Sequence, residues 1–232
     1  MNSFQKRKRV EKAYSKMYGR NIYSQDVNKR ECAAEPYRDG KYYSDCSSST
    51  RIAYQKADIG LDYIGGNTAD IYANNIKNIV KVTIRKDGTI KNADVVLRRG
   101  DLLMFAGTDE SRPLTIGHVE HVASVSKGKV VIGGHGSDKP SKKDLDDYCR
   151  MRQATKAQTK RGNRGLVCVL RPIDDDYVKS THKNGTRIFD AGKEIGIIPY
   201  GKKAVLLKKG LVRSTVVYGN VKGQARNKWL SF

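Results

Sequence analysis

Cysteine, long apolar runs and acidic residues are all scarce in this chain. Among 232 residues there are 4 cysteines, at Cys32, Cys46, Cys149 and Cys168. They show no CxxC spacing, so the sequence predicts neither a zinc site nor a disulfide framework, and reduced thiols are expected. No stretch is long and apolar enough to cross a membrane. No metal and no cofactor is expected.

The shortage of acidic residues leaves a strongly basic protein. Lys and Arg number 45 against 24 Asp and Glu, a formal net charge of +21. Such a field attracts polyanions, and nucleic acid is the first partner class to consider. The basic residues are spread over the whole length, which argues against a single basic tail. The start, residues 1–9, is basic but no apolar run follows it, so no secretion signal is predicted and a cytoplasmic product is expected.

The stretch around Cys46 is typical of a helix start. Asp45 and the serines that follow are residues favoured there, and apolar residues at helical spacing come next. In the first turn, unpaired backbone N–H groups and the helix dipole favour a thiolate, which is the nucleophilic form of cysteine. The alternative is a small buried cysteine that happens to follow a turn.

Histidines on later strands supply the partner that a cysteine nucleophile needs. Side chains alternate along a strand, so in residues 118–125 His118 and Glu120 share one face and His121 lies on the other. Only one of these histidines can therefore face Cys46, and the spacing alone leaves both open. The next strand, residues 130–132, returns antiparallel and leads to His135 among glycines.

These motifs, in this order, resemble the NlpC-type cell-wall cysteine peptidases, which are papain-like peptidoglycan hydrolases. The likeness covers about the first three quarters of the chain and is carried by Asp45-Cys46-Ser47-Ser48, Gly100-Asp101-Leu102, Gly117-His118-Val119-Glu120 and His135. The phage endolysin branch of that family is the most similar. That further likeness is carried by Tyr23-Ser24-Gln25, Tyr37, Gly65-Gly66-Asn67-Thr68 and Val169-Leu170-Arg171.

The resemblance implies roles for individual residues. Cys46 would be the nucleophile, and His118, directly after a glycine, would be the base, with His121 as the alternative. His135 would orient the base, or would be only a loop histidine. The implied substrate-binding residues are Tyr37, Tyr43, Asp45 and Ser47. A partly buried aromatic residue is the alternative for each tyrosine.

The predicted fold class is α+β: a papain-like domain with the cysteine helix packed on an antiparallel sheet, then a small all-β SH3-like barrel. The predicted domains are a peptidase over 1–172, a linker over 173–180 and a wall-binding domain over 181–232. A terminal β extension of the catalytic domain is the alternative for the last part. Helices are predicted over 4–18, 46–57, 68–75 and 141–155, a hairpin over 79–97, and strands over 102–106, 118–125, 130–132 and 166–170.

The resemblance implies an endolysin that cleaves the stem peptide or cross-bridge of peptidoglycan by a Cys-His-His mechanism. Its partners would be peptidoglycan and anionic wall polymers, and it would wait in the cytoplasm until release. An amidase of the same fold, cutting between sugar and peptide, is one alternative. Others are a basic nucleic-acid-binding protein with a small β-barrel, and a phage structural protein with an inactive peptidase fold. The retained Cys46, His118 and His135 argue against that last alternative.

Overall fold

A computed structural model describes residues 1–61, 66–158 and 164–232. It divides into two compact units: residues 6–173, and residues 1–5 together with 174–232. Gly65 of the Gly65–Thr68 segment lies outside the described residues. Within the described ranges, no helix has the length and apolar character of a membrane span.

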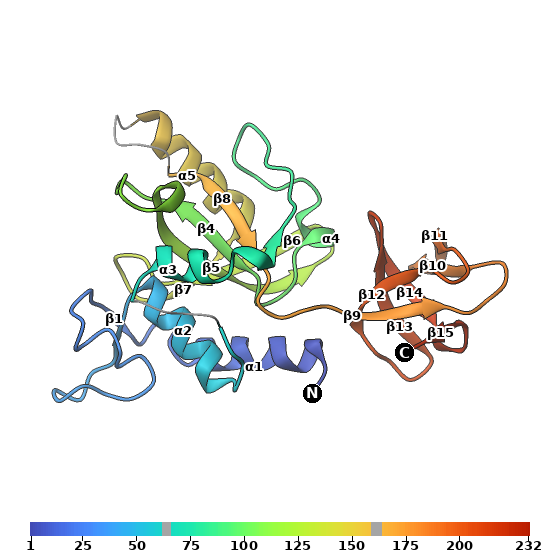
Figure 1. The fold of residues 1–232 in the computed structure, drawn as a ribbon, viewed down its shortest axis with the longest axis horizontal. Coiled ribbons are helices and arrows are strands. Elements are labelled where there is room, and N and C mark those ends of the chain that lie inside the picture. The colour runs from blue at the N-terminus through green and yellow to red at the C-terminus, as the bar shows by residue number, and fades with distance from the viewer. Residues whose placement is uncertain (62–65, 159–163) are drawn as a thin grey trace. The chain divides into compact units, whose positions relative to one another are not determined.

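The larger unit is built on an antiparallel sheet with the strand order β3-β8-β4-β5-β6-β7 (Figure 1). The strands of this sheet are β3 (Ile79–Val80), β4 (Leu102–Ala106), β5 (Ile116–Ser126), β6 (Lys129–Gly134), β7 (Ser141–Asp144) and β8 (Leu166–Leu170). A separate parallel pair joins β1 (Ile22–Tyr23) to β2 (Tyr43–Ser44). This pair leads the chain directly into the cysteine helix.

Helices cover both faces of the sheet. They are α1 (Ser3–Ser15), α2 (Cys46–Lys56), α3 (Thr68–Asn74), α4 (Ala93–Val96) and α5 (Leu145–Gln158). Figure 1 shows α1 and α2 on one side and α5 on the other. One buried cluster joins Tyr14 and Tyr54 to Met104, and a second joins Phe105 to Cys149 of α5. Every residue of β4 is buried, which explains why that strand is an uninterrupted apolar run.

The Gly100-Asp101 motif is a structural anchor. Gly100 has φ +82°, a conformation that favours glycine. Asp101 is fully buried and accepts hydrogen bonds from Arg171 at 2.8 and 3.0 Å and from the backbone N–H of Arg98 at 2.8 Å. Arg7 of α1 lies 3.4 Å from the same carboxylate. This turn therefore ties the start of β4 to α1 and to the end of β8.

Most predicted elements of this unit are confirmed, with three corrections. The helix predicted over 141–155 begins only at Leu145, because residues 141–144 extend the sheet by pairing with β6. The hairpin predicted over 79–97 is reduced to a turn with one bridge, Ile84 to Ile90, since Ile79 and Val80 pair with β8 instead. The helix predicted over 68–75 ends at Asn74, and Asn67 caps its start, because the Asn67 side chain accepts from the backbone N–H groups of Ala69 and Asp70.

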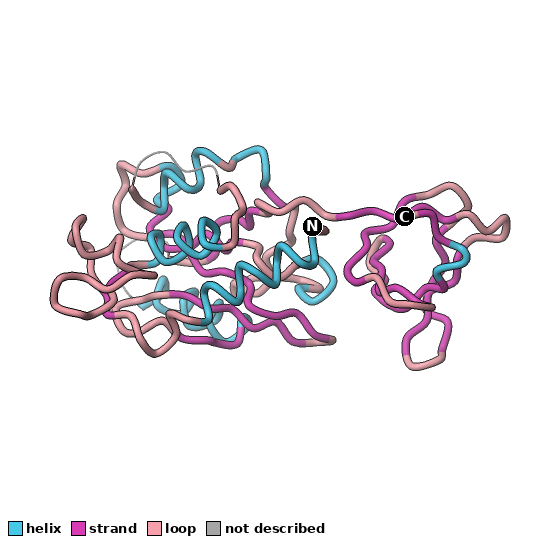
Figure 2. The backbone as a smooth tube through the Cα atoms, turned by 90° about the horizontal axis from the view of Figure 1, so that it is seen from below, coloured by secondary structure: helices cyan, strands magenta, loops and turns pink. Residues whose placement is uncertain are grey.

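The C-terminal unit is almost entirely strand and loop (Figure 2). Its strands are β9 (Asp176–Ser180), β10 (Thr186–Asp190), β11 (Lys193–Ile198), β12 (Lys203–Lys208), β13 (Arg213–Tyr218), β14 (Val221–Arg226) and β15 (Leu230–Ser231). They form one sheet in the order β11-β10-β14-β13-β12-β9-β15, around a small core that includes Val178, Ile188 and Val216. Over these described residues the sheet does not close into the predicted barrel.

Part of the predicted linker, residues 173–180, forms a strand of the C-terminal sheet. Asp176–Ser180 is the strand β9, which pairs with both β12 and β15. In this strand Val178 and Ser180 are buried and alternate with more exposed residues, as in a strand with one face on the core.

Candidate active site

The start of α2 fixes the position of Cys46. Asp45 is the N-cap: its carboxylate accepts from the backbone N–H of Ser48 at 2.7 Å, and the Ser48 hydroxyl accepts from the backbone N–H of Asp45 at 2.9 Å. This reciprocal capping box places Cys46 in the first turn, as the sequence predicted. There the backbone N–H of Cys46 has no acceptor inside the helix and points out of its positive end.

Cys46 and His118 lie in the same groove and act on each other's charge. Cys46 is 7% exposed, and its thiol lies 3.5 Å from the Thr68 hydroxyl. The Nε2 atom of His118 lies 2.8 Å from Oε1 of Glu120. Since Nε2 is committed to Glu120, Nδ1 is the ring nitrogen available to the thiol.

Each member of the pair shifts the pKa of the other so that the charged form of both side chains is favoured. Burial opposes a charged thiolate, but the neighbouring His118 outweighs it and lowers the pKa of Cys46. Burial also opposes a charged imidazole, but Cys46 and then Glu120 raise the pKa of His118 to about 9. Both shifts favour a thiolate beside an imidazolium, the reactive arrangement for a cysteine nucleophile.

Glu120 is held ionised beneath this pair. It is fully buried, and Lys143 donates to its Oε1 at 2.6 Å. Burial raises the pKa of Glu120, but His118 and Lys143 outweigh it, so the net shift is downward. A Cβ atom at Gly134 would lie 2.0 Å from the Glu120 carboxylate. The carboxylate therefore occupies space that exists only because position 134 is glycine.

His121 lies on the opposite face of β5, as the alternation requires. Its Nε2 lies 2.8 Å from Oε2 of Glu11 and 3.2 Å from the Tyr18 hydroxyl, and its ring centroid is 3.9 Å from that of Tyr14. Both tyrosines come from the segment of α1 and the turn after it. The structure thus places His118, and not His121, beside the thiol.

His135 lies in the site but is bonded elsewhere. Its Nδ1 shares a 2.8 Å hydrogen bond with the Ser44 hydroxyl, and its ring meets the Tyr23 ring edge-on at 5.4 Å. Burial lowers the pKa of His135 to about 4, so this imidazole is neutral near pH 7. The hydrogen bond that the sequence analysis expected His135 to provide to His118 is made by Glu120 in the structure.

A groove of about 610 Å³ opens over Cys46 and His118. Its described lining includes Tyr23, Gln25, Arg30, Asp45, Ser47, Asn67, Thr68, Arg112, His135, Lys143, Tyr148, Arg152 and Arg164. Asp45 and Ser47, predicted to bind substrate, lie in this lining, and Arg30 pairs with both, at 3.1 Å each. Arg and Lys far outnumber acidic residues in this lining, so the groove favours a substrate with negative charge.

The tyrosines predicted to bind substrate lie differently. Tyr37 and Tyr43 pack edge to face at 6.1 Å, and the Tyr43 hydroxyl donates to Asp39 at 2.7 Å. Neither belongs to the described lining of the groove, where Tyr23 stands instead. Local packing around β2 turns the two rings onto each other, which spacing along the sequence could not show.

Sequence reasoning missed Glu120, Arg30 and Thr68 as parts of this site. A signal for Glu120 was present, because residues two apart on a strand share a face and Glu120 follows His118 by two. Arg30 comes from a loop and carried no such signal, and Thr68, the first residue of α3, was noted only as part of the Gly65–Thr68 likeness. No group of three His, Cys, Asp or Glu side chains suited to a metal ion occurs within the described ranges.

Comparisons with known proteins found several solved structures of related shape, while no family model and no curated protein matched the sequence. The peptidoglycan hydrolase RipB from Mycobacterium tuberculosis is 16% identical, with a TM-score of 0.41 over 75% of this chain and 67% of that one. The P60 domain of an antigen from M. avium subspecies paratuberculosis is 16% identical, with a TM-score of 0.40 over 74% and 98%. NlpC1 from Trichomonas vaginalis is 15% identical, with a TM-score of 0.40 over 74% and 44%.

Proposed function

We propose that this protein is a peptidoglycan hydrolase that uses Cys46 as its nucleophile. The observation that carries the proposal is that Cys46, in the first turn of α2, and His118, held by Glu120, line the same basic groove. A thiolate, a charged partner and the free N–H groups of a helix start are what acyl transfer through a thioester needs. RipB, one of the similar structures, is named a peptidoglycan hydrolase, and the proposal itself rests on the geometry of the site.

In the proposed reaction the Cys46 thiolate attacks a peptide carbonyl of the stem peptide or cross-bridge. The C–N bond breaks, His118 gives its proton to the leaving amine, and a thioester to Cys46 remains. Water, deprotonated by His118, then attacks the thioester and returns the thiolate. The backbone N–H of Cys46 stabilises the oxyanion in both steps. Glu120 holds the His118 ring and compensates its positive charge, in the role that the sequence analysis gave to His135.

The test is digestion of Gram-positive cell walls, followed by loss of turbidity and by mass spectra of the released fragments. Wild type should clear the walls and leave fragments with new amine ends, and Cys46→Ala should do neither. Cys149→Ala is the matched control, because Cys149 is buried in α5 with its pKa raised by burial to about 12. If the Cys46→Ala variant still clears the walls, the proposed mechanism is wrong. Fragments that separate sugar from peptide would identify the amidase alternative.

We further propose that the protein acts as an endolysin and that its C-terminal unit binds the cell wall. In the turn before β13, Leu211 and Val212 are 100% and 73% exposed. Neighbouring exposed apolar side chains are typical of a contact surface. With Cys46→Ala as the inactive background, the protein should sediment with intact walls. A further Leu211→Ser/Val212→Ser change should leave more of it in solution, and equal sedimentation of the two proteins would reject this role for the turn.

A further inference from the structure

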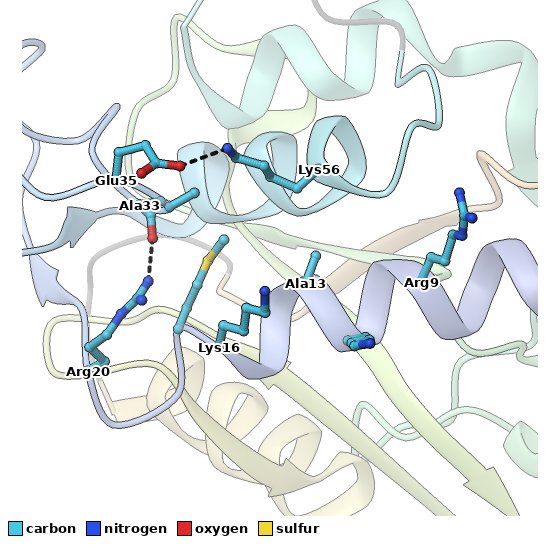
Figure 3. A pocket seen from close by; sticks show the side chains of 10 residues that line it. Arg9, Ala13, Lys16, Arg20, Ala33, Glu35 and Lys56 are labelled. Carbon is cyan, nitrogen blue, oxygen red and sulfur yellow. Dashed lines mark hydrogen bonds and ion pairs between the residues drawn. The ribbon is translucent and has the colours of Figure 1, made fainter.

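A second concave site lies along α1 and shares none of its described lining with the Cys46 groove. It measures about 360 Å³. Figure 3 shows it between α1, the loop that carries Ala33 and Glu35, and the end of α2. Its lining consists of Arg9, Lys12, Ala13, Lys16, Met17, Arg20, Ala33, Ala34, Glu35 and Lys56. Nothing in the proposed reaction uses these residues.

Positive charge in this pocket is mostly uncompensated. Its one acidic side chain in the described lining, Glu35, pairs with Lys56 at 2.9 Å. Arg20 donates to the Ala33 carbonyl at 2.7 Å and lies over the Tyr42 ring, 3.6 Å from its centroid.

The remaining cations of the pocket lie along α1 and its end. The side chains of Arg9, Lys12 and Lys16 are exposed, and within the described part of the chain they have no ion pair and no hydrogen bond. The pocket therefore presents three uncompensated cations to whatever enters it.

The spacing of these cations sets the size of the ligand. Arg9, Lys12 and Lys16 follow one another by three and four residues, which keeps them on one side of the helix. Arg9 and Lys16 are separated by roughly 10 Å along the axis at 1.5 Å per residue. A row of this length is long enough for consecutive phosphodiester groups on a flexible chain to contact it from end to end.

The apolar residues of the lining help to decide which kind of phosphodiester chain fits the pocket, a nucleic acid or a polymer without bases. Pockets that bind single-stranded nucleic acid offer aromatic rings on which bases stack. Here the described apolar lining is Ala13, Met17, Ala33 and Ala34, and the nearby Tyr42 ring is covered by Arg20. The site offers charge without a stacking surface, which suits a chain of phosphates joined by small polyols.

We propose that this pocket binds a polyol phosphate polymer through its phosphodiester groups. The proposal is independent of the Cys46 reaction, because binding needs neither the thiol nor the groove above it. Such a site would concentrate the protein on an anionic polymer while the Cys46 groove remains open to a peptide.

The test measures binding of a soluble poly(glycerol phosphate) to the full chain by calorimetry. Lys12→Glu/Lys16→Glu should weaken binding roughly tenfold or more, since each basic side chain near an anionic surface contributes measurably. Lys12→Arg/Lys16→Arg should bind like wild type. Lys81→Glu/Lys86→Glu is the matched control, because both lysines are exposed, lie outside the pocket and give the same change of net charge. It should lose much less affinity.

Three results would overturn the proposal. Equal loss in the pocket variant and in the control would mean that only the overall field attracts the polymer. Tighter binding of a single-stranded DNA with the same number of phosphates would assign the pocket to nucleic acid. Full competition by inorganic phosphate at similar concentration would reduce it to an isolated anion site. Hydrolysis of a soluble stem peptide should be the same in all these variants, which separates failure here from failure of the Cys46 mechanism.

Discussion

The Nε2 atom of His118 lies 2.8 Å from Oε1 of Glu120, a residue two positions along the same strand. Both side chains project from one face of β5, so the strand itself sets their relation. Lys143 lies 2.6 Å from the same oxygen and helps to keep the carboxylate charged. A histidine on a strand is thus oriented by an acid from its own strand rather than from the neighbouring one.

Replacing Glu120 by Gln should narrow the pH range of activity. The pKa of His118, raised to about 9, sets the alkaline limb, because the imidazolium must be protonated to pair with the thiolate and to serve the leaving amine. Without the carboxylate that limb should fall toward the ordinary histidine value of roughly 6.5. The measurement is kcat/KM against pH on a soluble stem peptide. An unchanged alkaline limb would show that Glu120 has no such role.

Replacing His135 by Asn should leave the alkaline limb where it is. His135 bonds Ser44, and its own pKa of about 4 keeps it neutral over the working range. Any loss of rate should therefore appear without a shift of the pH profile. A shift as large as that of Glu120→Gln would restore the orienting role that the sequence analysis gave to His135.

Gly134→Ala should impair the site from the neighbouring strand. The added Cβ would lie 2.0 Å from one carboxylate oxygen of Glu120 and 2.2 Å from its Cδ, so the side chain must move away from His118. The alkaline limb should shift in the same direction as in Glu120→Gln. Gly60→Ala is the control, since nothing lies within 4 Å of a Cβ there. Equal pH profiles for wild type and Gly134→Ala would contradict the proposed link.

Asp101→Ala should destabilise the larger unit. Its carboxylate is fully buried between Arg171 and Arg7, and its removal takes away the negative charge that compensates theirs, at a cost of roughly 3–5 kcal/mol. Urea unfolding followed by circular dichroism measures the change in unfolding free energy. Asp109→Ala, at an exposed carboxylate paired with Arg112, should change it by no more than about 0.5 kcal/mol. Equal unfolding free energies for the two variants would show that Asp101 does not act as a structural anchor.

Sequence alone located the elements whose pattern is local. The capping residues before Cys46 predicted the start of α2, and the apolar runs predicted β4 and β8 with the bounds observed. Alternation along residues 118–125 predicted that His118 and His121 face opposite sides. These inferences depend on periods and caps that neighbouring elements do not change.

What sequence missed depends on contacts between distant segments. Residues 141–144 look like a helix start until β6 provides a strand edge to pair with, and Asp144 then caps α5 from the strand end, accepting from the backbone N–H of Asp146 at 2.9 Å. The choice between Glu120 and His135 as the partner of His118 depends on where Ser44 lies, 91 residues before His135. Rules based on residue spacing do not predict a contact between residues so far apart in the sequence.

The most direct test of the account is the pH dependence of Cys46 alkylation by iodoacetamide, read by mass spectrometry of the peptide that contains it. An ordinary thiol has a pKa of roughly 8.5, and Cys46 in wild type should be alkylated at pH values well below it. His118→Ala should move the alkylation of Cys46 up into the ordinary range. Cys149 and Cys168, whose pKa values burial raises to about 12 and 11, are slow references in the same sample. Reaction of Cys46 as an ordinary thiol in both proteins would contradict the thiolate–imidazolium pair.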